Sequence, residues 1–152
     1  MKRNEANWPL SAILLLLFGA ALVLMGLYFL LLRPPLLPED LRYIGATQTQ
    51  LESGTPRLAY WLGWVFRVMG GYISATGILV ITLAATSFRA RNGRAVAGVA
   101  IAGFISIGWM TIVNFVIDSD FKWVLLGIAL LWAGGVVLFW FEARSTKRGV
   151  SI

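Results

Sequence analysis

Four long runs of apolar residues dominate the hydrophobic pattern of the chain. A bilayer core about 30 Å thick is crossed by a helix of about 20 apolar residues, because each residue adds about 1.5 Å. Runs of that length cover residues 10–32, 58–86, 95–117 and 123–141. Only the second contains a charged residue, Arg67. The pattern predicts an all-α integral membrane protein: an antiparallel four-helix bundle forming one transmembrane domain over residues 1–152.

The loop at 33–57 carries a second, shorter pattern. Pro38 is followed by Glu39 and Asp40, which is typical of a helix start, since acids interact favourably with the positive end of the helix dipole. Apolar residues then recur at spacings of three and four. This favours a short amphipathic helix lying on the membrane surface or over the mouth of the bundle. The alternative is a partly ordered loop with scattered leucines.

Composition and charge add a direction to this picture. Hydrophobic residues make up 59% of the chain and charged residues 13%, and the net charge is +6. Most basic residues lie in the two tails and in the loop after the second span: Lys2, Arg3, Arg89, Arg91, Arg94, Arg144, Lys147 and Arg148. The positive-inside rule predicts that these segments are cytoplasmic and that the 33–57 loop faces outward from a bacterial inner membrane. The charge is therefore explained by topology and by contact with lipid headgroups, and nucleic acid is not predicted as a partner.

Residues for catalysis are scarce. The chain has no histidine and no cysteine, so the commonest general base, the commonest metal ligand and all thiol chemistry are missing. Neighbouring acids occur at Glu39-Asp40 and at Asp118 with Asp120, but no nucleophile accompanies them. We therefore predict no catalytic residues, no metal and no cofactor.

Arg67 is the most informative single residue. An arginine within a span costs about 2.5–3.5 kcal/mol on insertion scales, so it needs compensation. Gly63, Gly70, Ser74 and Gly77 share a helical face with it, which predicts that Arg67 points into the bundle. The expected partners near the outer end are Glu39, Asp40, Asn114, Asp118 and Asp120. Either these residues pin the helices together, or Arg67 holds an anionic or carbonyl-bearing ligand in an outward-facing cavity.

Other glycines recur at spacings of four or seven along each remaining span. They are Gly19 and Gly26, Gly98 with Ala102, and Gly127 and Gly134. Small residues at such spacings let helices approach closely. We expect all three pairs to lie in helix packing seams.

The segment from Arg67 to Gly77, with paired glycines at Gly70-Gly71, resembles the second helix of DoxX-like small bacterial membrane proteins. The four-span layout is similar as well. The resemblance implies an accessory role in a membrane redox complex or a role linked to quinone.

These observations favour a non-enzymatic membrane protein, either an accessory subunit or a small lipid-binding or quinone-binding protein with an outward-facing polar site. The expected partners are membrane lipids, a quinone or a larger membrane complex. A transport or channel component is the alternative. A membrane enzyme acting on a lipid or quinone through Arg67, Asp118 and Asp120 is a third hypothesis.

Overall fold

The computed structural model describes the backbone of residues 8–148 and the side chains of residues 8–145. The basic residues Lys2 and Arg3, and the side chains of Lys147 and Arg148, lie outside the described part. The long helices are α1 (Leu10–Leu31), α4 (Leu58–Leu83), α5 (Gly93–Gly103), α6 (Trp109–Val116) and α7 (Lys122–Arg148). The π-helical turn η1 (Ala84–Phe88) extends α4, and η2 (Phe104–Gly108) joins α5 to α6.

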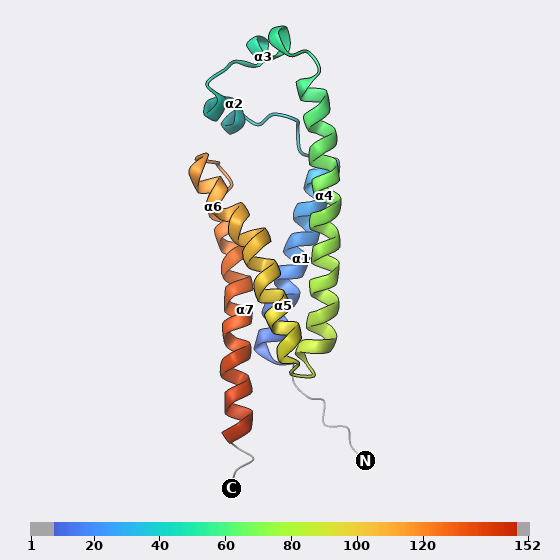
Figure 1. The fold of residues 1–152 in the computed structure, drawn as a ribbon, viewed down its shortest axis with the longest axis vertical. Helices are drawn as coiled ribbons and strands as arrows, with labels where there is room; N and C mark the ends of the chain where they lie inside the picture. Colours follow the sequence, from blue (N-terminus) through green and yellow to red (C-terminus); the bar gives the residue numbers. More distant parts are fainter. Residues whose placement is uncertain (1–7, 149–152) are drawn as a thin grey trace.

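Together these elements form four helices long and apolar enough to cross a membrane, namely Leu10–Leu31, Leu58–Phe88, Gly93–Val116 and Lys122–Ser145. They pack antiparallel, so the predicted all-α four-helix fold is confirmed (Figure 1). We call the end where α1 begins and α7 ends the termini end. The opposite end, with the connection from α1 to α4 and the turn at residues 117–121, is the loop end.

The connection between α1 and α4 contains two short helices, α2 (Pro38–Ile44) and α3 (Gln48–Gly54), where one was predicted. Gly45 ends α2 in the left-handed conformation, with φ of 73°. Thr47 then starts α3, because its hydroxyl accepts a hydrogen bond from the Gln50 amide at 3.2 Å. The helix is interrupted because a left-handed glycine, Gly45, and a new N-cap, Thr47, lie two residues apart.

The seam between α1 and α4 is built on glycine. A Cβ added to Gly26 would lie 2.5 Å from the Ser74 amide nitrogen, and one added to Gly77 would lie 2.7 Å from the Gly19 carbonyl oxygen. The two backbones therefore touch, as predicted for Gly19 and Gly26. The same expectation is wrong for Gly98 and Gly127, where an added Cβ would meet open space.

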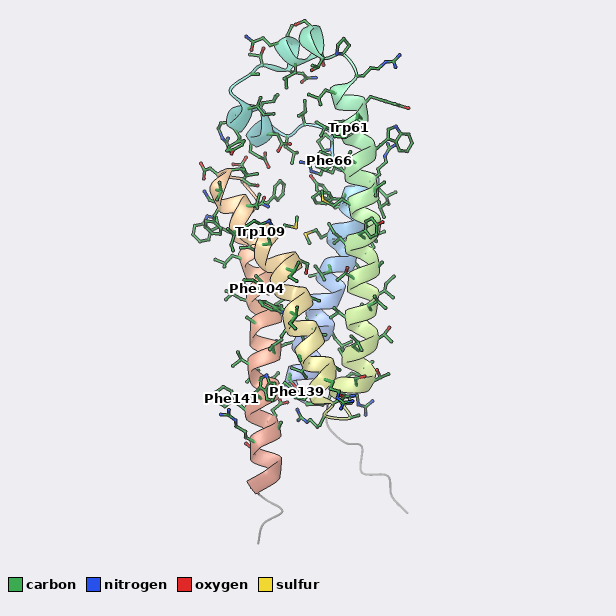
Figure 2. All side chains as sticks on the ribbon, viewed as in Figure 1. Trp61, Phe66, Phe104, Trp109, Phe139 and Phe141 are labelled. Atoms are coloured by element: carbon green, nitrogen blue, oxygen red, sulfur yellow. The ribbon has the colours of Figure 1, made fainter. Side chains whose placement is uncertain are left out.

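The apolar core is concentrated toward the termini end. Phe88 and Phe139 are almost fully buried there and pack edge to face, with ring centroids 5.5 Å apart. Figure 2 places Phe139 near the termini end and Phe66 near the loop end. Other buried apolar residues of that half are Ala12, Leu15, Phe18, Ala84 and Val96. The buried apolar side chains that join the helices are thus gathered toward the termini end.

Candidate functional site

Arg67 does not point into the bundle, so that prediction is wrong. Its side chain is exposed, and its guanidinium carbon lies 4.7 Å from the ring centroid of Trp64, one turn earlier on α4. Trp64 is itself exposed, at 50% of its maximum. Within the described part of the chain, no hydrogen bond or ion pair joins Arg67 to a carboxylate.

The error has a simple geometric origin. At about 100° per residue, Gly70, Gly77 and Ala84 lie about 60°, 80° and 100° around the helix from Arg67. All three are buried. The face of α4 that contacts α1 is therefore centred well away from Arg67. The Arg67 side chain lies at the edge of that face and projects away from the bundle.

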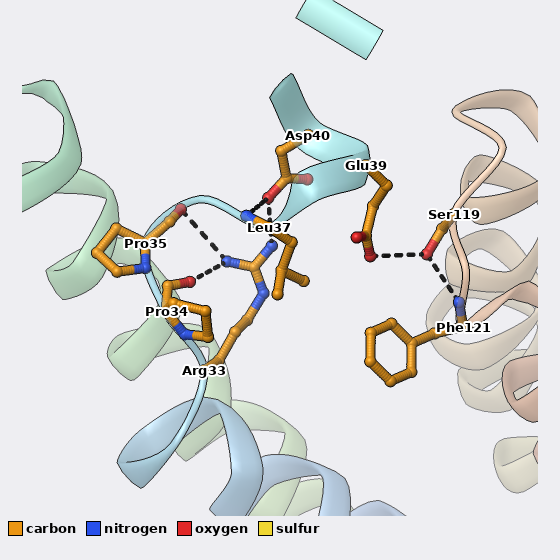
Figure 3. Close-up of polar contacts among 8 residues, drawn as sticks. All are labelled: Arg33, Pro34, Pro35, Leu37, Glu39, Asp40, Ser119 and Phe121. Carbon is orange, nitrogen blue, oxygen red and sulfur yellow. Dashed lines mark hydrogen bonds and ion pairs between the residues drawn. The ribbon is translucent and has the colours of Figure 1, made fainter. Parts of the chain in front are cut away.

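Arg33 is the buried arginine of the loop end. Its side chain is 7% exposed and donates to Asp40 Oδ2 at 3.0 Å and to the Pro34 carbonyl oxygen at 3.0 Å (Figure 3). The guanidinium carbon also lies 3.5 Å from the ring centroid of Phe66 on α4. Asp40 accepts a further hydrogen bond from the Leu37 amide at 2.8 Å, which fixes the start of α2.

Glu39 lies on the other side of α2 and is 2% exposed. Its Oε1 accepts a long hydrogen bond, 3.4 Å, from the Ser119 hydroxyl in the turn between α6 and α7 (Figure 3). Arg42 donates to the Asp118 carbonyl oxygen at 3.1 Å and to Asp120 Oδ1 at 3.0 Å. Through these contacts α2 bridges the α1–α4 pair and the α6–α7 turn.

The remaining predicted site residues are engaged locally. Lys122 donates to Asp118, and this hydrogen bond, with the positive charge of Lys122, lowers the pKa of the Asp118 carboxyl group. Asn114 donates to the Met110 carbonyl oxygen of its own helix at 2.9 Å. The structure thus gathers Glu39, Asp118 and Asp120 around one turn and leaves Arg67 apart from them.

A polar cluster at the termini end was missed from the sequence. Glu142 of α7 accepts hydrogen bonds from the Ser11 amide at 3.2 Å, the Ser11 hydroxyl at 2.6 Å and Arg91 Nη1 at 2.6 Å. One carboxylate therefore caps the start of α1 and holds the α4–α5 loop. We call Ser11, Arg91 and Glu142 the termini-end clasp. Its sequence signal was slight: Glu142 is the one acid among the described residues that lies in a basic flank of a span.

An open depression of about 520 Å³ lies between α2 and α3, lined by Leu41, Arg42, Ala46, Thr47 and Gln50. Arg67 is not part of it. In the described residues, no cluster of three or more acids has the arrangement of a metal site.

No family model matches the chain, and neither a curated protein nor a solved structure does. The resemblance to DoxX-like proteins therefore stays a prediction. Gly70 and Gly77, which contribute to it, have a packing role in the α1–α4 seam.

Proposed function

We propose that the protein is a non-enzymatic, lipid-binding protein of the bacterial inner membrane, with both termini in the cytoplasm and the loop end facing outward. The observation that carries this proposal is an imbalance in how charges are paired. Each acid among the described residues has a hydrogen-bond partner within the chain: Glu39, Asp40, Glu52, Asp118, Asp120 and Glu142.

Five arginines, in contrast, have no carboxylate within ion-pair distance in the described part. They are Arg57 and Arg67 near the loop end, and Arg89, Arg94 and Arg144 near the termini end. At the termini end the unneutralised charge is positive. At the loop end Arg57 and Arg67 are balanced in net charge by Glu39 and Glu52, but these two acids are already hydrogen-bonded within the chain, so the two arginines are left without an acceptor. At the surface of a membrane, the anions available in greatest number are lipid phosphates, which arginine binds with its fork of N–H donors. The arrangement favours lipid binding at both surfaces.

The non-enzymatic part of the proposal is supported by the same pairing. A catalytic acid or base has to reach its substrate. The described acids instead neutralise arginine or lysine, cap helices or bind side chains in neighbouring turns. The chain also lacks histidine and cysteine.

Native mass spectrometry of the full chain, released from membranes in a mild detergent, tests the proposed function. We expect phospholipid adducts that survive delipidation steps which strip annular lipid. A chain that emerges free of phospholipid would contradict the proposal. If it carries a quinone, or stays with a larger partner protein, the quinone-binding or accessory-subunit role would replace lipid binding.

A further inference from the structure

The depth of Arg67 in the membrane follows from how α4 is matched with α1. The Arg89 guanidinium lies 4.4 Å from the ring centroid of Trp8, so the termini ends of the second and first spans are level. The second span has 31 residues, from Leu58 to Phe88, and the first has 22. About 20 residues cross the bilayer core, and counting back from Phe88 reaches Val68.

A contact at the loop end indicates the same depth for Arg67. Phe66 packs on Phe29 of α1 with ring centroids 6.1 Å apart, and it lies against Arg33, which follows the last turn of α1. Arg67 is the next residue after Phe66. Its guanidinium therefore lies at the loop-end boundary of the hydrocarbon core, where lipid phosphates and glycerol groups are found.

Arg67 belongs to an exposed face of α4 that we call the Arg67 face. It comprises Tyr60, Trp64, Arg67, Val68 and Gly71, which fall within about 100° of one another around the helix. Tyr60 is 70% exposed and Val68 is 61% exposed. A Cβ added to Gly71 would meet nothing within 4 Å. The face thus carries a cation beside two aromatic rings, with open space over Gly71 one turn further along α4, which we call the notch.

This combination is suited to one kind of ligand. A guanidinium lying over an indole ring keeps its N–H edge free, and the described residues offer that edge no acceptor. A phosphodiester supplies oxygen acceptors and a negative charge at the same depth. The notch at Gly71 leaves room for the glycerol backbone or the first part of an acyl chain below the phosphate.

Resting on the lipid binding proposed above, we infer that the Arg67 face is a specific site for the phosphodiester of an anionic phospholipid in the leaflet at the loop end. Arg67 binds the phosphate oxygens, Trp64 holds the guanidinium in place, and Gly71 admits the apolar part of the lipid. The site lies on the outside of the bundle and needs no cavity between helices.

The test compares the wild-type chain with Arg67→Gln by native mass spectrometry during titration with dioleoylphosphatidylglycerol in detergent. We expect the affinity for the first lipid bound to fall about fivefold, as for the loss of one arginine at an anionic surface. Arg42→Gln is the matched control, because it removes one exposed loop-end charge that is already paired with Asp120. Its affinity is expected to equal that of the wild type.

Gly71→Leu is the second variant, because it fills the notch and leaves every charge in place. We expect weaker binding of phosphatidylglycerol with an unchanged thermal midpoint. Dioleoylphosphatidylcholine should bind to the wild type about fivefold more weakly than phosphatidylglycerol, because its choline group cancels the charge of the phosphodiester. Equal binding of the two lipids would overturn the assignment to an anionic lipid. Inorganic phosphate at millimolar concentration should not displace the lipid, and displacement would assign the site to free phosphate and overturn the inference.

The two proposals fail in different ways. If the wild type binds no phosphatidylglycerol, both the lipid-binding function and the Arg67 site are overturned. If it binds the lipid and Arg67→Gln binds it equally well, only the Arg67 site is overturned. An equal loss in Arg67→Gln and Arg42→Gln would show that net charge governs binding, which also overturns the site.

Discussion

The two halves of the bundle hold their helices together by different means. Toward the loop end, the backbones of α1 and α4 touch at Gly26 and Gly70, because neither glycine places a Cβ between the helices. At the termini end, Glu142 joins α1 and the α4–α5 loop through charged hydrogen bonds. The first contact depends on shape and dispersion, which salt does not screen. The second depends on charge, which salt weakens.

The polar contacts of the two ends also differ in how far apart in the sequence the joined residues lie. Arg33 and Asp40 are seven residues apart, so their ion pair shapes the entry into α2. Ser11 and Glu142 are 131 residues apart, so their hydrogen bonds connect the first and last helices. Across the loop end, the connection from α2 to the α6–α7 turn rests on exposed contacts of Arg42 with Asp120 and the Asp118 carbonyl oxygen, and on one long hydrogen bond to Glu39. The loop end is therefore the half with the weaker polar tie.

The largest effect is expected from Gly26→Ala. The new methyl group would lie 2.6 Å from the Gly70 carbonyl oxygen, so the two helices must separate. We expect a loss of about 3 kcal/mol in the free energy of unfolding, measured by SDS titration followed by far-UV circular dichroism. Gly98→Ala is the control, because its methyl group meets open space. Equal losses in both variants would show that the seam is not what holds this half.

Glu142→Ala tests the termini-end clasp. Removal of the carboxylate leaves the Ser11 amide and Arg91 without their acceptor, so we expect a loss of about 2 kcal/mol in the same SDS titration. The loss should shrink at high salt, whereas that of Gly26→Ala should not. Glu52→Ala, which removes an exposed acid bonded to Gln48, is the control and should be near neutral. If the stability lost in Glu142→Ala does not depend on salt, the clasp is not held by charge, and the proposed difference between the two halves is wrong.

A smaller effect is expected from Arg42→Gln at the loop end. The Arg42 and Asp120 side chains are 53% and 64% exposed, and such pairs contribute about 0.5 kcal/mol. The sharper measurement is the distribution of distances between spin labels at Tyr43 of α2 and Val124 of α7, both exposed positions, which should broaden as the tie between α2 and the α6–α7 turn is lost. An unchanged distance distribution would mean that Glu39 and Ser119 hold the bridge alone.

The smallest effect concerns pH and Asp118. Since Lys122 lowers the pKa of this carboxyl group, its contribution to stability is fully present above its unfolded pKa of about 4 and is lost as the pH falls through the lower folded value. The exposed position keeps the contribution small. Asp118→Asn should therefore match the wild type at the lowest pH and be slightly less stable at pH 7. A variant as stable as the wild type at both would show that the ion pair contributes nothing.

The four spans were accessible from the sequence because bilayer thickness imposes a length that hydrophobic runs reveal directly. The orientation of Arg67 was not accessible in the same way. Gly63, Gly70 and Ser74 share a broad face with it, but only the observed contact with Gly26 shows that the centre of that face is turned away from Arg67.

The polar contacts of the two ends were harder to predict. Glu39, Asp118 and Asp120 were expected near the loop end, and α2 does bring Glu39 to the α6–α7 turn. The termini-end clasp joins residues in three distant segments, and no spacing pattern within one segment predicts such a contact. Arg33 was expected to be an ordinary loop residue. Its burial could not be predicted, because it depends on Phe66, a residue of another helix.

The clasp also bears on the order in which the chain is assembled. Ser11 enters the membrane early in synthesis, whereas Glu142 is made 131 residues later. Until α7 has been inserted, the first turn of α1 lacks the acceptor that caps its amide, and Arg91 lacks its counterion. The clasp thus closes only after α7 has been made, and a chain truncated before residue 142 would lack it.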